Sequence, residues 1–504
     1  MRTTRRGSLT RSWRRPAVLV CLAAALSAST VGVVEAHTVA SRPNIVFVLT
    51  DDLSANLVTE QFMPNLWALE QQGATFTNYF VTDSLCCPSR ASIFTGRYPH
   101  DTGVFNNSGA DGGYGAFQSH NDENSTVATD LQSVGYRTAM MGKYLNRYHT
   151  NDPPGPGWDA WDVADWGYPE FHYDLNENGR IVHYGGPQQP RKDNYLTDVL
   201  SGLADSFVAN TMTNRPSQPF FLEVATFAPH DPYTPAPRYA DLYPHLTYPV
   251  TPAFDAATIN APPWLGDRPP LTPNQLDGID TAYRKRAESV KSVDDLIGSL
   301  ISTLRKTGQL ANTYFVFSSD NGLHMGEHRL MPGKLTAFDT DIHVPLIVVG
   351  PKVSAASTVQ AFAENVDLRS TFDALAGTQP SEAVDGRSLS PLLFDPTTAP
   401  AGWPTGVLVE HHGPDTKASA GPDSPAPFSG NPPSYEALRI THALYVEYAN
   451  GEHEYYDLST DPDELDNVYA TLAPQSVAAF HRELIALENC HDSPNCSQVS
   501  VPTS

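Results

Sequence analysis

The chain has 504 residues, with 32 Lys and Arg against 56 Asp and Glu, and a formal net charge of −24. This length indicates roughly two to three domains or one large α/β unit with an appendage, and a 40% share of hydrophobic residues excludes a wholly disordered chain. The acidic balance argues against nucleic acid as the main partner, because phosphate backbones are bound by clustered Lys and Arg.

The first 36 residues are predicted to be an export signal that does not belong to the fold. Six arginines come before the apolar stretch 16–28, and residues 34–36 provide a small-residue cleavage site. Because Arg-Arg pairs occur at 5–6 and 14–15, an ordinary secretory signal and a twin-Arg signal both stay open. We therefore expect a secreted or otherwise exported protein without a membrane span. Its charge becomes −29 once the six arginines and one glutamate of the signal are removed.

Buried strands are indicated by short apolar runs that are rich in β-branched residues. Such runs cover residues 44–50, 136–141, 220–227, 313–317 and 344–349. Uninterrupted runs are typical of strands buried on both faces, so we expect an α/β fold with a large, mostly parallel sheet covered by helices. Between two of these strands, residues 282–305 place apolar side chains at helical spacing and predict a helix.

Polar side chains follow four of the predicted strands. They are Asp51, Asp52, Lys143, His230, Asp320 and Asn321. In α/β sheets, ligands bind outside the carboxyl ends of the strands. Each of these residues alone is more often a helix cap or a turn residue, but six of them at four strand ends indicate one site.

The character of the chain changes near residue 400. Residues 406–410 predict a strand, and the Pro- and Gly-rich stretch 412–434 predicts a long surface loop. Residues 437–458 predict strands joined by a hairpin turn at Asn450-Gly451, and an amphipathic helix follows around residues 477–487. We therefore expect a main domain at 37–400 and a smaller C-terminal α+β domain with an antiparallel sheet at 401–504.

Four cysteines remain after the signal. Cys490 and Cys496 flank a short turn and are expected to form a disulfide in an oxidising compartment. Cys86 and Cys87 are adjacent, and neighbouring cysteines rarely bridge each other because the geometry is strained. This pair in an exported protein requires a chemical explanation.

The segment CCPSRASIFTGR, residues 86–97, carries the most information in the chain. Pro88 suits the first turn of a helix and Gly96 suits its end. Cys86 is therefore expected next to a helix N-terminus, where backbone N–H groups favour an anion. Arg90, about one turn later, is placed to face the same site.

This segment matches the type I sulfatase signature, and the chain resembles sulfatases over most of its length. Residues 86–107 and 142–146 are most similar to the N-acetylglucosamine-6-sulfatase branch. The resemblance implies the alkaline-phosphatase-like sulfatase fold. It also implies that a formylglycine-generating enzyme converts Cys86 to formylglycine during maturation, with Cys87 as a spectator.

The resemblance also implies roles for individual residues. One divalent cation, Ca²⁺ with Mg²⁺ as the alternative, is expected on oxygen ligands. The implied ligands are Asp51, Asp52, Asp320 and Asn321, and the implied sulfate-binding and catalytic side chains are Arg90, Lys143, His230 and Lys334. Asn146 is a candidate for binding substrate, and His328 is expected either to touch substrate or to pack its loop. Many sulfatases have Lys-x-His where this chain has Lys143-Tyr144-Leu145, so the base that assists sulfate release is unassigned.

The expected reaction is hydrolysis of a sulfate monoester of a sugar or an aryl alcohol. One hydroxyl of the hydrated aldehyde at residue 86 attacks sulfur, His230 protonates the leaving oxygen, and the second hydroxyl expels sulfate. Two alternatives stay open. The first is hydrolysis of phosphate or phosphonate esters on the same fold, and the second is a catalytically silent carbohydrate-binding protein. The strongly negative charge further predicts action on terminal residues or small fragments rather than on long sulfated chains.

Overall fold

The computed structural model describes residues 42–185, 194–414, 424–492 and 496. Ser41–Ser504 forms one compact unit. The predicted export signal at 1–36 lies outside the described residues, and the division at residue 400 stays a prediction. None of the described helices combines the length and the apolar character needed to cross a bilayer.

A sheet of ten strands forms the centre of the unit, in the order β11-β2-β10-β9-β1-β8-β4-β5-β6-β7. Its strands are β1 (Asn44–Thr50), β2 (Ala74–Phe76), β4 (Arg137–Lys143), β5 (Ala160–Ala164), β6 (Tyr173–Glu177), β7 (Arg180–Tyr184), β8 (Phe220–Ala225), β9 (Thr313–Ser319), β10 (Leu346–Val349) and β11 (Ser357–Val359). The five contiguous strands from β9 to β5 are parallel. The strands β10, β6 and β7 run antiparallel to their inner neighbours. The predicted large, mostly parallel sheet is confirmed, with antiparallel additions towards both sides.

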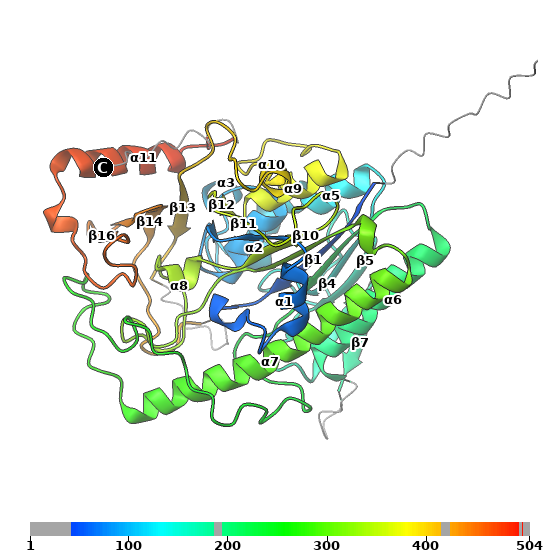
Figure 1. Ribbon diagram of the computed structural model, residues 1–504, viewed down its shortest axis with the longest axis horizontal. Helices are drawn as coiled ribbons and strands as arrows, with labels where there is room; N and C mark the ends of the chain where they lie inside the picture. The colour runs from blue at the N-terminus through cyan, green and yellow to red at the C-terminus, as the bar shows by residue number, and fades with distance from the viewer. Residues whose placement is uncertain (1–41, 186–193, 415–423, 493–495, 497–504) are drawn as a thin grey trace, which may run out of the picture. The chain divides into compact units, whose positions relative to one another are not determined.

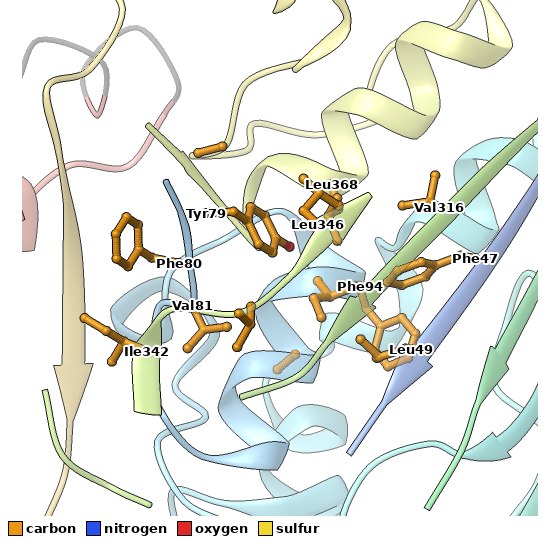
Figure 2. Packing of buried hydrophobic residues seen from close by; sticks show 14 of the residues in the cluster. Phe47, Leu49, Tyr79, Phe80, Val81, Phe94, Val316, Ile342, Leu346 and Leu368 are labelled. Atoms are coloured by element: carbon orange, nitrogen blue, oxygen red, sulfur yellow. The ribbon is translucent and has the colours of Figure 1, made fainter. Parts of the chain in front are cut away.

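Helices cover both faces of this sheet (Figure 1). The long helices α6 (Leu196–Asn214) and α7 (Pro273–Lys306), together with α1 (Pro64–Glu70), share one apolar core with Val46 and Val48 of β1. The helices α2 (Cys86–Thr95), α5 (Val127–Ser133) and α9 (Asp367–Ala376) share the other core with Ile45, Phe47 and Leu49. Figure 2 shows part of this second core, where Phe47 and Leu49 lie beside Phe94 of α2. Alternate residues of β1 therefore serve opposite cores, as expected for a strand buried on both faces.

The helix predicted at 282–305 is longer than its apolar pattern, because α7 begins at Pro273. Thr272 and Gln275 form a capping box: the Thr272 side chain accepts from the Gln275 N–H and the Gln275 side chain accepts from the Thr272 N–H. Proline follows at the first helical position. This start signal was present in the sequence, but it precedes a polar stretch that hides the helical period.

A second sheet, of four antiparallel strands, follows in the C-terminal part of the chain. It consists of β13 (Gly406–His411), β14 (Tyr435–Ile440), β15 (Ala443–Tyr448) and β16 (His453–Asp457) in that order. The predicted turn at Asn450-Gly451 joins β15 to β16, and a further hairpin joins β14 to β15. The final helix α11 (Pro474–Glu488) packs on this sheet. The predicted disulfide between Cys490 and Cys496 is formed.

Shorter elements complete the described fold. They are the strand pair β3 (Tyr79–Phe80) and β12 (Ala363–Glu364), the helices α3 (Pro99–Thr102), α4 (Gly113–Ser119), α8 (Asp339–Ile342) and α10 (Ser390–Phe394), and the 3₁₀ turns at Ala55–Leu57, Asp122–Asn124, Leu310–Asn312 and Tyr469–Thr471.

The register of the central strands decides which polar residues meet. Thr50 at the end of β1 pairs with Ser319 at the end of β9. Because the strands are parallel, the residues after them leave the sheet side by side. Lys143 ends β4, which lies on the other side of β8 from β1. The sheet therefore brings the predicted site residues together at the C-terminal ends of its central strands.

Candidate active site

The residues after β1 and β9 form a buried group of oxygen donors. Asp51, Asp52, Asp320 and Asn321 are at most 3% exposed. Asp320 Oδ1 accepts from the backbone N–H of Asp52 at 3.1 Å and of Asn321 at 2.8 Å. The Asn321 side-chain amide donates to Asp52 Oδ1 at 2.7 Å. The structure thus brings the four predicted metal ligands together.

Cys86 lies in the middle of this group, as the first residue of α2. Its thiol donates to Asp51 Oδ1 at 3.1 Å, and its Sγ lies 3.8 Å from Asp52 Oδ1. Burial, with Asp320 and Asp51 adding to it, raises the pKa of the Cys86 thiol well above its ordinary value. As a plain cysteine, this residue is therefore a neutral thiol and a poor nucleophile at neutral pH.

The neighbouring Cys87 has different surroundings. Its side chain is buried in the apolar core, and its backbone N–H donates to Asn107 Oδ1 at 2.9 Å. Gly96 ends α2 in the left-handed conformation, at φ 68°, as its sequence position predicted. The helix therefore presents Cys86 to the polar group while Cys87 packs into the core.

Two lysines neutralise the aspartates. Lys143 Nζ lies 2.5 Å from Asp51 Oδ2, and Lys334 Nζ lies 2.6 Å from Asp52 Oδ1 and 2.8 Å from Cys86 Sγ. Burial opposes the charge on Lys334, but the neighbouring carboxylates, Asp52 foremost and then Asp51, outweigh it and raise its pKa. Burial likewise favours the neutral form of Asp51, yet Lys143 and the other cations outweigh it and lower its pKa. The buried charges hold one another in the ionised state.

Arg90 and His230 complete the cationic side chains. Arg90 Nε donates to Asp320 Oδ2 at 2.8 Å, and Nη1 donates to the Lys143 carbonyl at 2.8 Å. His230 Nδ1 lies 2.9 Å from the Asp231 carbonyl, which aims Nε2 to within 3.4 Å of an Asp52 carboxylate oxygen. One edge of the sheet therefore holds every predicted catalytic side chain.

The family that the sequence resembles implies a divalent cation, and the chain's own donors fit one. The side-chain Oδ1 of Asn321 is buried and accepts no hydrogen bond from the described residues. An unpaired buried acceptor beside three carboxylates is suited to a hard cation. A second grouping, Asp51, Asp52, Cys86 and His230, places potential ligand atoms within 4.8 Å of one another. Both groupings share Asp51 and Asp52, so these two carboxylates are common to both candidate ligand sets.

The site opens into a pocket of about 640 Å³. Asp52, His230 and Lys334 lie at its polar part. The remaining walls are mostly apolar. They are formed by Leu85, Asp231, Tyr233, Leu323, residues 331–333, Leu335, and by residues 424–427 with Ser429 from the segment 424–429. The predicted surface loop at 412–434 thus contributes, through its described part, a wall of the pocket.

The two predicted substrate-binding residues lie in different surroundings. Asn146 is 5% exposed, and its amide approaches the Tyr168 hydroxyl at 3.4 Å, next to the ring of His230. His328 stacks on Phe338 at 3.9 Å between ring centroids and shares a 2.9 Å hydrogen bond with Thr258. Asn146 therefore lies beside the catalytic group, whereas His328 is packed against Phe338 and Thr258. Neither side chain is among the residues that line the pocket.

Sequence reasoning missed one buried arginine that supports the site. Arg286 on α7 is fully buried and donates to the backbone carbonyl of Asp52 at 2.6 Å and to Ser54 Oγ at 3.1 Å. A charged residue in line with Val290 and Val293 interrupts the apolar stripe of this helix. Such an interruption is the signal that could have revealed it, because a buried charge needs partners.

Comparisons with known proteins agree with this geometry. The family model described as Sulfatase matches residues 43–378. The human N-acetylglucosamine-6-sulfatase is 33% identical over 490 residues, covering 91% of this chain and 87% of that protein. The N-acetylglucosamine-6-O-sulfatase of Bacteroides thetaiotaomicron is 27% identical and covers 85% of this chain and 83% of that protein.

Solved structures share the fold. A protein in complex with its substrate D-glucosamine-2-N,6-O-disulfate superposes with a TM-score of 0.70 at 24% identity, over 89% of this chain and 97% of that one. The phosphonate monoester hydrolase of Agrobacterium radiobacter gives 0.67 at 21% identity, over 88% and 95% of the two chains. At these identities the likeness shows the fold alone. Together with the sequence relatives and the assembled site, it leads to one conclusion: the chain belongs to the Sulfatase family and is a sulfuric ester hydrolase.

Proposed function

We propose that the protein is a formylglycine-dependent sulfatase that removes sulfate from small sulfated sugars of the N-acetylglucosamine-6-sulfate type. The observation that carries the proposal is the position of Cys86, whose sulfur contacts both Lys334 and Asp51. The substrate class rests on the relatives at 33% and 27% identity, both of which are N-acetylglucosamine-6-sulfatases.

Residue 86 supplies the nucleophile in this proposal. The sulfur of Cys86 stands in for the oxygen of the converted side chain. Formylglycine provides a hydrated aldehyde with two hydroxyl groups. One hydroxyl attacks the sulfur atom of the sulfate ester and displaces the alcohol. The other then re-forms the aldehyde and expels sulfate. Residue 86 is buried and contacts both Lys334 and Asp51, so its side chain already lies beside the cationic residues. Such preorganisation is what a displacement at sulfur requires.

The cations bind and neutralise the sulfate. Lys143, Lys334 and Arg90 surround residue 86 and offer N–H donors to the sulfate oxygens, where negative charge is held in the transition state. Asp51, Asp52, Asp320 and Asn321 would hold one divalent cation, Ca²⁺ or Mg²⁺, which as a Lewis acid polarises the sulfate oxygens. The carboxylates in turn keep the lysines charged and oriented.

His230 is the proton donor for the leaving alcohol. Its Nδ1 is held by the Asp231 carbonyl, so Nε2 faces the pocket floor at Asp52. The neighbouring Asn146 is proposed to bind a sugar hydroxyl, because its side-chain oxygen is buried and accepts no hydrogen bond from the described residues. Leu145 has no group that transfers a proton, so the base for sulfate release stays unassigned.

The decisive experiment combines mass spectrometry with kinetics. In active protein, the peptide covering residues 81–97 is expected to show the mass of formylglycine at residue 86. Cys86→Ala should abolish turnover of para-nitrophenyl sulfate and of N-acetylglucosamine-6-sulfate. Cys87→Ala is the matched control, since this neighbouring thiol only packs into the core, and it should retain activity.

Two outcomes would contradict the proposal. Full activity with an unconverted thiol at residue 86 would remove the formylglycine mechanism. Faster turnover of an aryl phosphonate ester than of either sulfate would instead favour the phosphonate hydrolase alternative, whose representatives share this fold.

A further inference from the structure

A fully buried histidine connects the metal-ligand loop to the loop that carries Lys334. His324 lies three residues after Asn321 and is 0% exposed. Its backbone N–H donates to the Gly333 carbonyl at 3.0 Å, and the Gly333 N–H donates to the His324 carbonyl at 3.1 Å. Gly333 directly precedes Lys334, so this pair of hydrogen bonds attaches His324 to the lysine's own backbone.

The His324 ring makes two further connections. Its Nδ1 lies 2.9 Å from both carboxylate oxygens of Asp341 in α8, and its Nε2 lies 2.7 Å from the backbone carbonyl of Ser429. Burial disfavours the charged ring, but Asp341 outweighs it and raises the pKa of His324. A charged ring donates from both nitrogens, which matches acceptors on both sides.

The same carboxylate also holds the chain after Lys334. Asp341 Oδ2 accepts from the Thr336 N–H at 3.1 Å and from the Thr336 hydroxyl at 2.6 Å. Residues on both sides of Lys334 are therefore tied to the His324–Asp341 pair. Ser429, held by the other ring nitrogen, belongs to the pocket wall at 424–429.

We propose that His324 is a positioning residue, which fixes Lys334 against residue 86 and at the same time holds the pocket wall at 424–429 in place. The inference rests on the proposed function for the role of Lys334. It assigns to His324 a task that neither the sequence motif nor the catalytic contacts account for. His324 does not touch the reacting atoms and acts through the segments that it joins.

The packing around Gly333 shows how little freedom these segments have. A Cβ atom at Gly333 would lie 2.6 Å from Ser429 Cβ, 2.7 Å from the Ser429 carbonyl oxygen and 3.1 Å from His324 Nε2. Gly333→Ala therefore separates the same three segments while leaving the histidine in the chain. We call the contacts of His324 with Gly333, Asp341 and Ser429 the clamp, and Gly333→Ala is a second, independent way to weaken it.

The chain offers a control histidine that has the same pattern of contacts as His324 and is partly buried. His100 Nδ1 lies 2.9 Å from Glu410 Oε2, and its Nε2 lies 2.9 Å from the Cys490 carbonyl. Like His324, this ring pairs with a carboxylate on one side and a backbone carbonyl on the other. It lies outside the pocket-lining residues. His100→Ala thus removes a comparable clamp without changing the site.

Hydrogen exchange tests the clamp without relying on activity. The N–H groups of Gly333 and of Met331, which donates to the Phe428 carbonyl at 3.0 Å, report on the joined segments. In His324→Ala these amides are expected to exchange at least about tenfold faster than in the wild type, because their closed state is destabilised. His100→Ala should leave them unchanged. Unchanged exchange in both His324→Ala and Gly333→Ala would overturn the proposal.

Kinetics then test the consequence for catalysis. With para-nitrophenyl sulfate, His324→Ala is expected to lower kcat by about 10- to 100-fold, since a small displacement of a catalytic group has effects of this size. His324→Gln should recover part of this loss, because its amide nitrogen lies near the position of Nε2 and can donate to Ser429. A kcat of His324→Ala equal to that of His100→Ala would contradict the assignment.

The two experiments separate the two proposals. If the wild-type protein fails to hydrolyse any sulfate ester, the proposed function fails, while the exchange measurement still decides whether the clamp exists. If His324→Ala does not fold, Gly333→Ala carries both tests: faster exchange with a lower kcat supports the positioning role, and wild-type values for both overturn it.

Discussion

At the scale of single residues, the main feature of this protein is a group of buried charges at the C-terminal ends of the parallel strands. Asp51, Asp52 and Asp320 face Lys143, Lys334 and Arg90 at hydrogen-bond distance. Buried charges are costly unless each has a partner. Each of these three carboxylates has a cationic partner, which offsets the cost of burying so many charges in one place.

His230 is predicted to matter most for poor leaving groups. A sugar alkoxide needs a proton as it leaves, whereas para-nitrophenolate does not. His230→Gln should therefore lower kcat for N-acetylglucosamine-6-sulfate by roughly 10²- to 10⁴-fold, the usual effect of a general acid. The loss with para-nitrophenyl sulfate should be much smaller. Steady-state kinetics with both esters check this, and equal losses would show that His230 acts only by binding sulfate.

Glu223 is a buried acid that no described side chain satisfies. It lies on β8, is 0% exposed, and neither carboxylate oxygen accepts a hydrogen bond from the part of the chain that the structure describes. Burial raises its pKa from 4.5 to about 8, although Arg90 acts in the opposite direction. The folded protein therefore holds a proton between pH 4.5 and 8 that the unfolded chain releases, so the free energy of unfolding falls as pH rises through this window.

Glu223→Gln should remove this dependence, because glutamine is neutral at every pH. We expect the variant to be more stable than the wild type at pH 8, on the order of 4 kcal/mol, and to show nearly the same stability at pH 4. Denaturant unfolding at the two pH values measures the difference. A parallel pH dependence in both proteins would mean that Glu223 is already ionised in the folded state.

At the scale of elements, the end of β4 depends on close backbone packing. Gly142 has φ 94°, and a Cβ there would lie 1.9 Å from the Ala225 carbonyl oxygen of the neighbouring strand β8. The next residue is Lys143, so a displacement of the β4 backbone at Gly142 also moves a cationic side chain of the site. The requirement for glycine is therefore both conformational and steric.

Gly142→Ala is predicted to destabilise the protein by about 3 kcal/mol or more, from the strained φ and the forced overlap, and to lower kcat/KM. Gly135→Ala is the matched control. Gly135 has φ 91°, but a Cβ there would meet open space. Gly135→Ala should lower the free energy of unfolding by only about 1 kcal/mol and leave kcat/KM unchanged. Denaturant unfolding and kcat/KM of the two variants test this, and equal destabilisation would show that the contact with β8 relaxes freely.

Long-range charge acts at the scale of the whole molecule. The chain carries a net charge of −24, and the active site accepts anions. A sulfated polymer is repelled along its entire length, whereas a monosaccharide sulfate carries one charge to a locally cationic site. The protein should therefore act on terminal residues and small fragments.

Ionic strength gives a direct test of this expectation. Raising NaCl from about 10 mM to about 150 mM shortens the Debye length from roughly 30 Å to 8 Å. Activity on a long sulfated polysaccharide should then rise relative to activity on N-acetylglucosamine-6-sulfate. Preferential cleavage inside long chains at low salt would contradict the prediction, because repulsion is then at its strongest.

The sequence by itself determined the local elements. Runs such as residues 44–50 and 313–317 predicted strands, because burial on both faces leaves an uninterrupted apolar pattern. The segment 86–97 predicted a helix with Cys86 at its start and Gly96 at its end. These features depend on neighbouring residues, so they can be read without knowing what packs against them.

Only the tertiary structure decided which distant segments meet. Lys334 reaches Cys86 across 248 residues, and His324 reaches Ser429 across 105. The wall at 424–429, the support of Asp52 by Arg286 and the antiparallel strands β6 and β7 also come from such pairings. Local periodicity encodes which face of an element is buried, whereas the partner on that face depends on strand order and side-chain complementarity over the whole chain.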